Sequence, residues 1–144
     1  MAVAHILRQK GSDVVTVSPS DTVQAIVDTL ATHRIGAVIV VDATGAISGI
    51  VSERDVVRAL SGDAAGIMQK TAGEIMTAKV RTCSPADSEQ ELMQLMTENR
   101  IRHLPVVVNG RLAGMISIGD VVKLRMESIE REAEEMKSYI ASAG

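Results

Sequence analysis

The sequence is almost free of aromatic side chains: its 144 residues include no Trp, no Phe and one Tyr, Tyr139. The interior must therefore be built from Val, Ile, Leu, Ala and the eight Met, whose flexible side chains fill irregular gaps. The flat platforms on which the bases of single-stranded nucleic acids stack are missing as well. This scarcity excludes a protein that binds single strands by stacking, although an adenine ring can still be held between aliphatic side chains.

Cysteine, excess charge and long apolar runs are also scarce. The one cysteine, Cys83, excludes an internal disulfide and a cysteine-based zinc site, and His5 and His33 have no partner at metal-ligand spacing. The formal net charge of −3 argues against a general nucleic-acid-binding surface. No apolar run reaches the ~18–20 residues that span a bilayer, and the N-terminus lacks the pattern of a secretion signal. We therefore expect a cytoplasmic, globular protein without metal, membrane or nucleic-acid partners, in which Cys83 is packed and inert.

Most of the chain consists of two copies of one unit of roughly 46 residues. Residues 14–60 align with residues 80–125, first at an offset of 66 and then, after one residue is lost in a turn, at an offset of 65. The identical pairs include Thr16/Thr82, Pro19/Pro85, Gln24/Gln90, Ile35/Ile101, Gly49/Gly114, Ser52/Ser117 and Asp55/Asp120.

Each copy has the local signals of the element order β-α-β-β-α. Asp21 followed by Gln24 is typical of a helix start, and Asp87 with Gln90 repeats the pattern in the second copy. The pair Asn109-Gly110 indicates a tight hairpin. The expected strands cover residues 14–17, 37–41, 46–51, 104–108 and 111–116, a short helix covers residues 68–77, and the closing helices begin at Ser52 and Ser117.

A unit of about 46 residues buries too little surface to be stable alone, so the two copies are expected to share a core around a pseudo-twofold axis. We therefore predict an α/β (α+β) fold of two repeats, residues 8–66 and 67–126, joined by a linker at residues 61–66. A helical extension over residues 127–144 follows. Two equivalent clefts arise at the joint of such a pair, where ligand sites are common.

The repeated pattern Gly-x-x-Ser-x-x-Asp lies where a strand gives way to a helix, as Ser52 and Asp55 and again as Ser117 and Asp120. A helix N-terminus carries free N–H groups and a partial positive charge that favour a phosphate. The Asp carboxylate can accept hydrogen bonds from two adjacent hydroxyls of a ribose. The alternative is that Ser and Asp only cap the helix, but their recurrence in both copies at the proposed joint favours a ligand site.

These residues resemble a known family. The segments Gly-Ile-Val-Ser-Glu-Arg-Asp-Val at residues 49–56 and Gly-Met-Ile-Ser-Ile-Gly-Asp-Val at residues 114–121 resemble the corresponding motifs of the CBS (cystathionine β-synthase) domain pair, or Bateman module. The segment at residues 99–107 also resembles a signature of that family, and the likeness covers residues 4–126. It implies a stand-alone regulatory module that binds AMP, ADP, ATP or NAD(H), with S-adenosylmethionine less favoured, and that requires no cofactor.

The resemblance also implies two nucleotide sites, each shared between the repeats. One site would join Ser117 and Asp120 to Ser12, Val14, Ile35, Gly36 and Ala37, with Lys10 as its cation. The other would join Ser52 and Asp55 to Arg54, Ala78, Val80, Ile101, Arg102 and His103. Because the second set carries more positive charge, we predict tighter polyphosphate binding at the Asp55 site.

The closing helix of the second repeat continues with apolar residues at intervals of four and three, the spacing of a heptad seam. Its members are Val122, Met126, Ile129, Ala133, Met136 and Ile140. The seam either packs back onto its own module or the segment at residues 4–7, or forms a homodimer contact, which we favour.

The sequence is compatible with more than one class of function. The leading hypothesis is a nucleotide sensor whose state is read by a separate effector protein. The alternative is a structural or adaptor module without functional ligand sites, which the intact Ser and Asp of both copies disfavour. Catalysis is not expected, because the sequence offers no activated nucleophile or acid–base pair. The chain is also too short for the roughly 200-residue barrel of inosine monophosphate dehydrogenase, an enzyme that carries this module.

Overall fold

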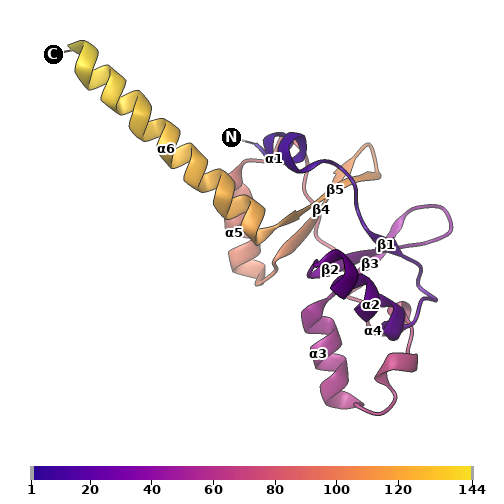
Figure 1. Cartoon of the computed structure of the whole chain (residues 1–144). Coiled ribbons are helices and arrows are strands. Elements are labelled where there is room, and N and C mark those ends of the chain that lie inside the picture. Colours follow the sequence, from indigo (N-terminus) through magenta and orange to yellow (C-terminus); the bar gives the residue numbers. More distant parts are fainter. Residues whose placement is uncertain (1, 144) are drawn as a thin grey trace.

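The computed structural model describes residues 2–143 and has two β-sheets with helices around them (Figure 1). The first repeat contains β1 (Thr16–Val17), α2 (Val23–His33), β2 (Ala37–Val41), β3 (Ile47–Ser52) and α3 (Glu53–Gly62). The second contains α5 (Glu89–Asn99), β4 (His103–Val108), β5 (Arg111–Ser117) and α6 (Ile118–Ala143). The helix α1 (Val3–Lys10) precedes them, and the 3-10 turn η1 (Ile67–Gln69) and α4 (Ala72–Ile75) connect them. The predicted α/β fold of two related halves is confirmed.

The first repeat forms a three-stranded sheet in the order β1-β2-β3, with β1 parallel and β3 antiparallel to β2. In the second repeat, β4 and β5 pair as an antiparallel hairpin. Within the described residues, the expected first strand of this repeat is reduced to one parallel bridge between Cys83 and Val106. The cause lies in the sequence, because the β-branched run at residues 14–17 has no equal at residues 80–83, where Arg81 interrupts it.

The two repeats share fine details that local sequence alone does not require. Arg34 and Arg100 end α2 and α5 in the same left-handed conformation, each with φ 53°. Both hairpins carry a register shift at the same place, after Val40 and after Val106. Because a left-handed non-glycine residue is uncommon, its recurrence supports a true internal repeat.

The helix starts differ from the prediction by one residue. Thr22 and Ser88, not Asp21 and Asp87, cap α2 and α5 with their hydroxyl oxygens. Asp21 instead accepts a hydrogen bond from the N–H of Ser18, and Asp87 accepts the equivalent bond in the second repeat. The acidic side chains therefore close the preceding turn, which leaves the next hydroxyl free to act as the cap.

The linker also differs from the prediction. Helix α3 extends through Gly62, so the expected linker begins inside it. The expected helix over residues 68–77 is divided, because Lys70 has the extended ψ of 159° and Thr71 opens α4 with a capping box to Glu74.

The core consists of two apolar clusters, one for each repeat, and not of the single shared core that the sequence predicted. The segments preceding the repeats are exchanged between the clusters. Val3 and Ile6 of α1 pack into the cluster of the second repeat. Ala72 and Ile75 of α4 pack into the cluster of the first. Each half is therefore completed by a segment from outside its own strands and helices.

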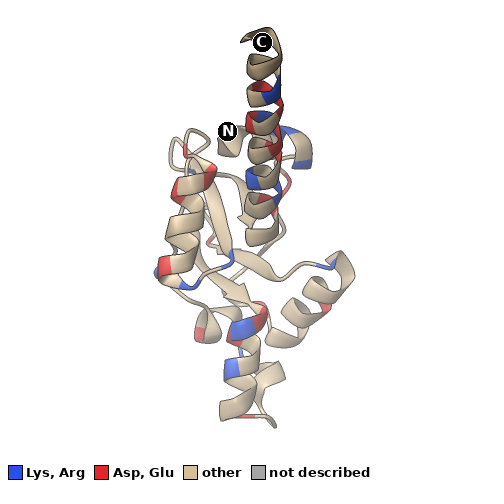
Figure 2. Cartoon of the chain, turned by 90° about the vertical axis from the view of Figure 1, so that its left-hand side faces the viewer, with Lys and Arg blue, Asp and Glu red and all other residues tan. Residues whose placement is uncertain are grey.

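Helix α6 leaves the body and projects beyond it (Figure 1), and acidic and basic residues are distributed along its length (Figure 2). No helix among residues 2–143 is both long and apolar enough to cross a membrane.

Candidate functional site

The first candidate site is the Asp55 corner, made by Ser52, Asp55 and Thr77 where β3 runs into α3. The Asp55 carboxylate accepts hydrogen bonds from the N–H of Ser52 at 2.8 Å and from its hydroxyl at 3.0 Å. Its other oxygen accepts the Thr77 hydroxyl at 3.1 Å and lies 3.8 Å from the Arg58 guanidinium. Asp55 is only 8 % exposed, so these donors offset the cost of burying its charge. Ser52 and Asp55 therefore do cap α3, as the alternative interpretation of the sequence expected.

The equivalent Asp120 corner is made by Ser117, Asp120 and Lys10. The N–H of Ser117 donates to the Asp120 carboxylate at 2.9 Å, as at the first corner. The Lys10 ammonium lies 2.7 Å from the same carboxylate oxygen and 3.0 Å from the carbonyl oxygen of Met115. Lys10 therefore lies where its sequence interpretation put it, but its charge is already paired with Asp120.

The Lys10 contact changes the acidity of Asp120. Partial burial would raise the pKa of this carboxyl, but the hydrogen bond from Lys10, the N–H of Ser117 and the positive charge of Lys10 outweigh it. The pKa of Asp120 is consequently held below its ordinary value. A ribose that approached this corner would have to displace the ammonium group.

Two glycines allow these corners to form. A Cβ on Gly49 would lie 2.6 Å from the Met76 sulfur and 2.8 Å from the Thr77 carbonyl oxygen. At the equivalent Gly114, a Cβ would lie 2.6 Å from a methyl carbon of Leu7. The absence of a side chain lets the exchanged segments cross close above β3 and β5. This crossing brings Thr77 to Asp55 and Lys10 to Asp120.

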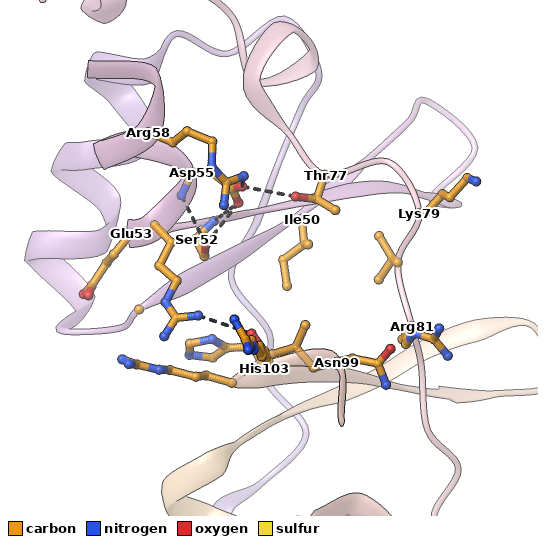
Figure 3. A pocket seen from close by; sticks show the side chains of 16 residues that line it. Ile50, Ser52, Glu53, Asp55, Arg58, Thr77, Lys79, Arg81, Asn99 and His103 are labelled. Carbon is orange, nitrogen blue, oxygen red and sulfur yellow. Dashed lines mark hydrogen bonds and ion pairs between the residues drawn. The ribbon is translucent and has the colours of Figure 1, made fainter. Parts of the chain in front are cut away.

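The Asp55 corner opens into the Asp55 cavity, a space of about 360 Å³ between the repeats. In Figure 3, Ser52, Asp55 and Thr77 lie on one side, with His103 and Asn99 on the opposite wall and Ile50 between them. The lining residues predicted from the sequence are Ser52, Arg54, Asp55, Val80, Ile101, Arg102 and His103, joined by Gly36 from the other predicted set. Ala78 does not line the cavity.

The remaining residues predicted for the Asp120 site differ in burial. Ser12 is exposed and Val14 is half-buried, so both remain accessible from the chain's surface. Ile35 is half-buried, and Ala37 is buried within β2. Their role as ligand contacts stays a prediction.

The cavity lining is strongly basic although the chain as a whole has a net charge of −3. Its carboxylates are Glu53 and Asp55, and its cationic side chains are Arg54, Arg58, Lys79, Arg81, Arg100 and Arg102. Sequence reasoning missed the other lining residues, which are Ile50, Glu53, Arg58, Thr77, Lys79, Arg81, Asn99 and Arg100. Thr77, Lys79 and Arg81 are neighbours of the predicted Ala78 and Val80 in the sequence, but adjacent residues of an extended segment face opposite sides, so this position gave no signal.

Arg54 connects the two halves at the edge of this cavity. Its guanidinium donates a hydrogen bond to the carbonyl oxygen of Arg100 at 3.2 Å, across the repeat boundary. Arg100 has the left-handed conformation described above, which ends α5 next to the cavity. The two repeats are therefore joined by a direct contact at the edge of the cavity.

His103 lies between the two corners. A Cβ on Gly36 would be 3.1 Å from its ring, so the residue before β2 lies close to the side chain of the first residue of β4. Burial lowers the pKa of His103, and the charges of Lys10 and Arg102 lower it further, against the opposing effects of Glu53 and Asp120. His103 is therefore neutral at neutral pH, and it does not add to the positive charge that the sequence interpretation assigned to it.

The lone cysteine lies apart from this chemistry. Burial, together with the nearby negative charge of Asp87, raises the pKa of the Cys83 thiol to about 12. Such a thiol is unreactive at neutral pH, as the sequence led us to expect.

Comparisons with known proteins agree with this architecture. The sequence matches the CBS domain over residues 3–62 and again over residues 72–127. It is 48 % identical to the CBS-domain containing protein ATU1752 from Agrobacterium tumefaciens, with a TM-score of 0.84 over 86 % of this chain and 92 % of that one. It is 33 % identical to the CBS domain-containing protein CBSX3, mitochondrial, of Arabidopsis thaliana, over 96 % of this chain and 71 % of the relative.

A third similar structure contains ligands. The CBS domain pair of protein MJ0100, solved in complex with 5-methylthioadenosine and S-adenosyl-L-methionine, is 25 % identical, with a TM-score of 0.78 over 89 % of this chain and 98 % of that one. The internal repeat, the two Ser–Asp corners and these matches lead to one conclusion: the chain belongs to the CBS domain family and carries a pair of CBS domains, a regulatory module.

Proposed function

We propose that the Asp55 cavity binds an adenine nucleotide, namely AMP, ADP, ATP or NAD(H), and that its occupancy is transmitted to a separate effector protein. The observation that carries this proposal is the combination of a buried Ser–Asp corner with a basic cavity at the joint of two repeats. Asp55 would accept the ribose hydroxyls. Ile50, Val80 and Ile101 offer apolar surface for a base, and the surrounding arginines would hold phosphate.

The charge of the cavity favours one class of adenosyl compound. The related MJ0100 module was solved with S-adenosyl-L-methionine and 5-methylthioadenosine, neither of which carries a phosphate. In this chain, the excess of Arg and Lys around the cavity disfavours a cationic sulfonium and attracts an anion. We therefore propose that phosphate-bearing nucleotides bind more tightly than S-adenosylmethionine, and that ATP binds more tightly than AMP.

Transmission requires that the ligand interact differently with two arrangements of the repeats. Arg54 is suited to this role, because it lines the cavity and also bonds to the Arg100 carbonyl in the second repeat. A phosphate that drew the Arg54 guanidinium away from that carbonyl would loosen a direct link between the halves. The effector would then recognise the altered pair.

The proposal is tested by thermal unfolding and calorimetric titration with AMP, ADP, ATP, NAD, NADH, S-adenosylmethionine and adenosine. A ligand at a hundredfold excess over its dissociation constant stabilises the folded chain by about 2.7 kcal/mol at each site. We expect stabilisation by nucleotides in the order of their phosphate charge, without turnover. Absence of any stabilisation would overturn the proposal and favour an adaptor module.

A further inference from the structure

Helix α6 has two apolar stripes, and the rest of the chain covers one of them. Val121, Leu124 and Ser128 are buried, and the first two pack into the core cluster of the second repeat with residues of α1. Arg125 lies 3.7 Å from Glu89 of α5 beside this stripe. The N-terminal segment thus does pack onto α6, as one of the sequence interpretations expected. However, the face of α6 that this segment covers is a different one from the predicted seam.

The second stripe is the predicted seam, and it faces away from the body. Its large residues are substantially exposed, with Ile129 at 50 %, Met136 at 58 % and Ile140 at 63 %. The far half of α6 projects clear of the sheets and other helices (Figure 1). An isolated helical segment of this length is marginally stable in water, so an apolar stripe along it needs a covering surface.

We propose that this stripe is the interface of a parallel, in-register coiled coil formed with a second copy of the chain. Its contact positions are Val122, Met126, Ile129, Ala133, Met136 and Ile140, which alternate at intervals of four and three as knobs-into-holes packing requires. From Val122 to Ile140 the seam is about 27 Å long at the rise of an α-helix. A seam this short predicts a dimer that dissociates on dilution.

The charged residues beside the seam indicate that the partner is a second copy of the chain and that the two helices run parallel. In a parallel pair, the residue just before Met126, Ala133 or Ile140 on one helix faces the residue five positions later on the other helix. Glu132 then faces Lys137 of the partner subunit, and the twofold axis makes this contact of opposite charges occur twice. Arg125 would face Glu130 of the partner subunit, but its guanidinium already lies 3.7 Å from Glu89 of its own chain, so the direction rests on Glu132 and Lys137.

An antiparallel pair with the whole seam overlapping would place like charges together. Glu130 would face its own copy, Glu132 would do the same, and Lys123 would face Lys137 of the partner subunit. Each of these contacts opposes association. The charged residues beside the seam therefore favour the parallel arrangement, because it brings opposite charges together and the antiparallel arrangement brings like charges together.

The first experiment measures the mass of the full chain by analytical ultracentrifugation over a range of concentrations. We expect twice the 15.3 kDa of one chain at high concentration, and one chain for the double variant Ile129→Asp/Met136→Asp. Because both side chains are exposed, this variant should keep the melting temperature of the body. Val57→Asp is the matched control, since Val57 is 65 % exposed on α3 and is expected to leave the dimer intact.

Three results of this first experiment would overturn the proposal. A wild-type chain that stays monomeric would show that the stripe is not covered by a second copy and serves a different partner. A double variant that stays dimeric would place the interface elsewhere, and so would a Val57→Asp variant that dissociates. None of these outcomes depends on nucleotide binding.

The second experiment tests direction. Glu132→Lys is expected to weaken dimerisation about tenfold by replacing two attractive contacts with two repulsive ones, and Glu132→Lys/Lys137→Glu is expected to restore it. Glu135→Lys changes the net charge equally but lies away from the seam, so it serves as the control. Failure of the double exchange to restore dimerisation would overturn the parallel arrangement.

A crosslink gives an independent measure of register. Ile140→Cys is expected to form a disulfide-linked dimer under mild oxidation, because identical contact positions meet only in a parallel, in-register pair. Ser138→Cys on the outer face should form none, and the buried Cys83 should not interfere. Crosslinking that is equal for the two variants would contradict the register.

Discussion

The two Ser–Asp corners have the same backbone and differ in what their exchanged segments supply. At Asp55, the segment after α4 supplies the neutral hydroxyl of Thr77, 3.1 Å from the carboxylate. At Asp120, the segment after α1 supplies the ammonium of Lys10 at 2.7 Å. Asp55 has the exposed Arg58 guanidinium as its ion-pair partner, at 3.8 Å, whereas Asp120 is paired with an ammonium group at hydrogen-bond distance. An internal repeat can therefore preserve the backbone of a site while one side chain determines whether its carboxylate is free to bind a ligand.

The difference extends beyond the carboxylates. The Asp55 side is surrounded by Arg54, Arg58 and Arg102, which can hold phosphate at the mouth of the cavity. On the Asp120 side, the cation that the sequence offered for phosphate is held at the ribose corner instead. We therefore expect the first cleft to bind nucleotide more tightly than the second, and four predictions test that comparison.

The largest effect is expected for Asp55→Ala. Loss of a charged acceptor for the ribose should weaken ATP binding about tenfold to a hundredfold, as measured by calorimetric titration. Asp120→Ala removes the equivalent capping carboxylate and is the matched control, with an expected change below about twofold. Circular dichroism at the assay temperature verifies that both variants are folded. Equal losses for the two variants would contradict the asymmetry.

The next effect concerns stability and compares the two crossing points. Gly49→Ala should cost about 1–3 kcal/mol of unfolding free energy, because its Cβ would meet the Thr77 carbonyl oxygen at 2.8 Å as well as Met76. Gly114→Ala should cost less, because the new methyl group would meet only the flexible Leu7 side chain. Urea denaturation of the two variants measures the difference. A larger loss for Gly114→Ala would show that the backbone at Thr77 moves freely.

The sequence predicted well those parts of the molecule that depend on neighbouring residues. The hairpin at Asn109-Gly110 and the Ser–Asp caps involve residues at most three positions apart, and the internal repeat doubled every such signal. Asn109 and Gly110 both have the positive φ that this turn requires, 52° and 76°. The one-residue error at Asp21 arose because Asp, Thr and Ser are all good caps, so composition alone could not select Thr22.

The sequence could not predict the contacts that distinguish the two corners. Lys10 and Asp120 are 110 positions apart, and Arg54 reaches a backbone carbonyl 46 positions away. No local pattern indicates that α1 completes the second repeat while α4 completes the first. Such an exchange follows from packing of Val3 and Ile6, whose apolar character is compatible with either half.

A smaller effect is expected when the Asp120 corner is released. Lys10→Met should raise the pKa of Asp120 toward its ordinary value and lower stability at neutral pH by less than about 1 kcal/mol, since both side chains are partly exposed to screening solvent. The wild-type contribution is present above the ordinary pKa of an Asp and is lost as pH falls through the lowered pKa of Asp120. The variant should therefore lose less stability on acidification. Calorimetric titration should also reveal a second, weaker nucleotide site, and unchanged stoichiometry would mean that Lys10 does not block it.

The smallest effect is expected for the pH dependence of ATP binding, through the side chain of His103. His103 is neutral at neutral pH because burial and the charges of Lys10 and Arg102 lower its pKa, although Glu53 and Asp120 oppose them. A bound phosphate favours the protonated imidazole, so binding takes up a proton and ATP affinity should rise a few-fold between about pH 8 and pH 6. His103→Gln should remove that rise and leave the opposite trend, because the free phosphate itself takes up a proton and loses negative charge as pH falls. An identical pH profile in the variant would place the phosphates away from His103, on the Arg58 side of the Asp55 cavity.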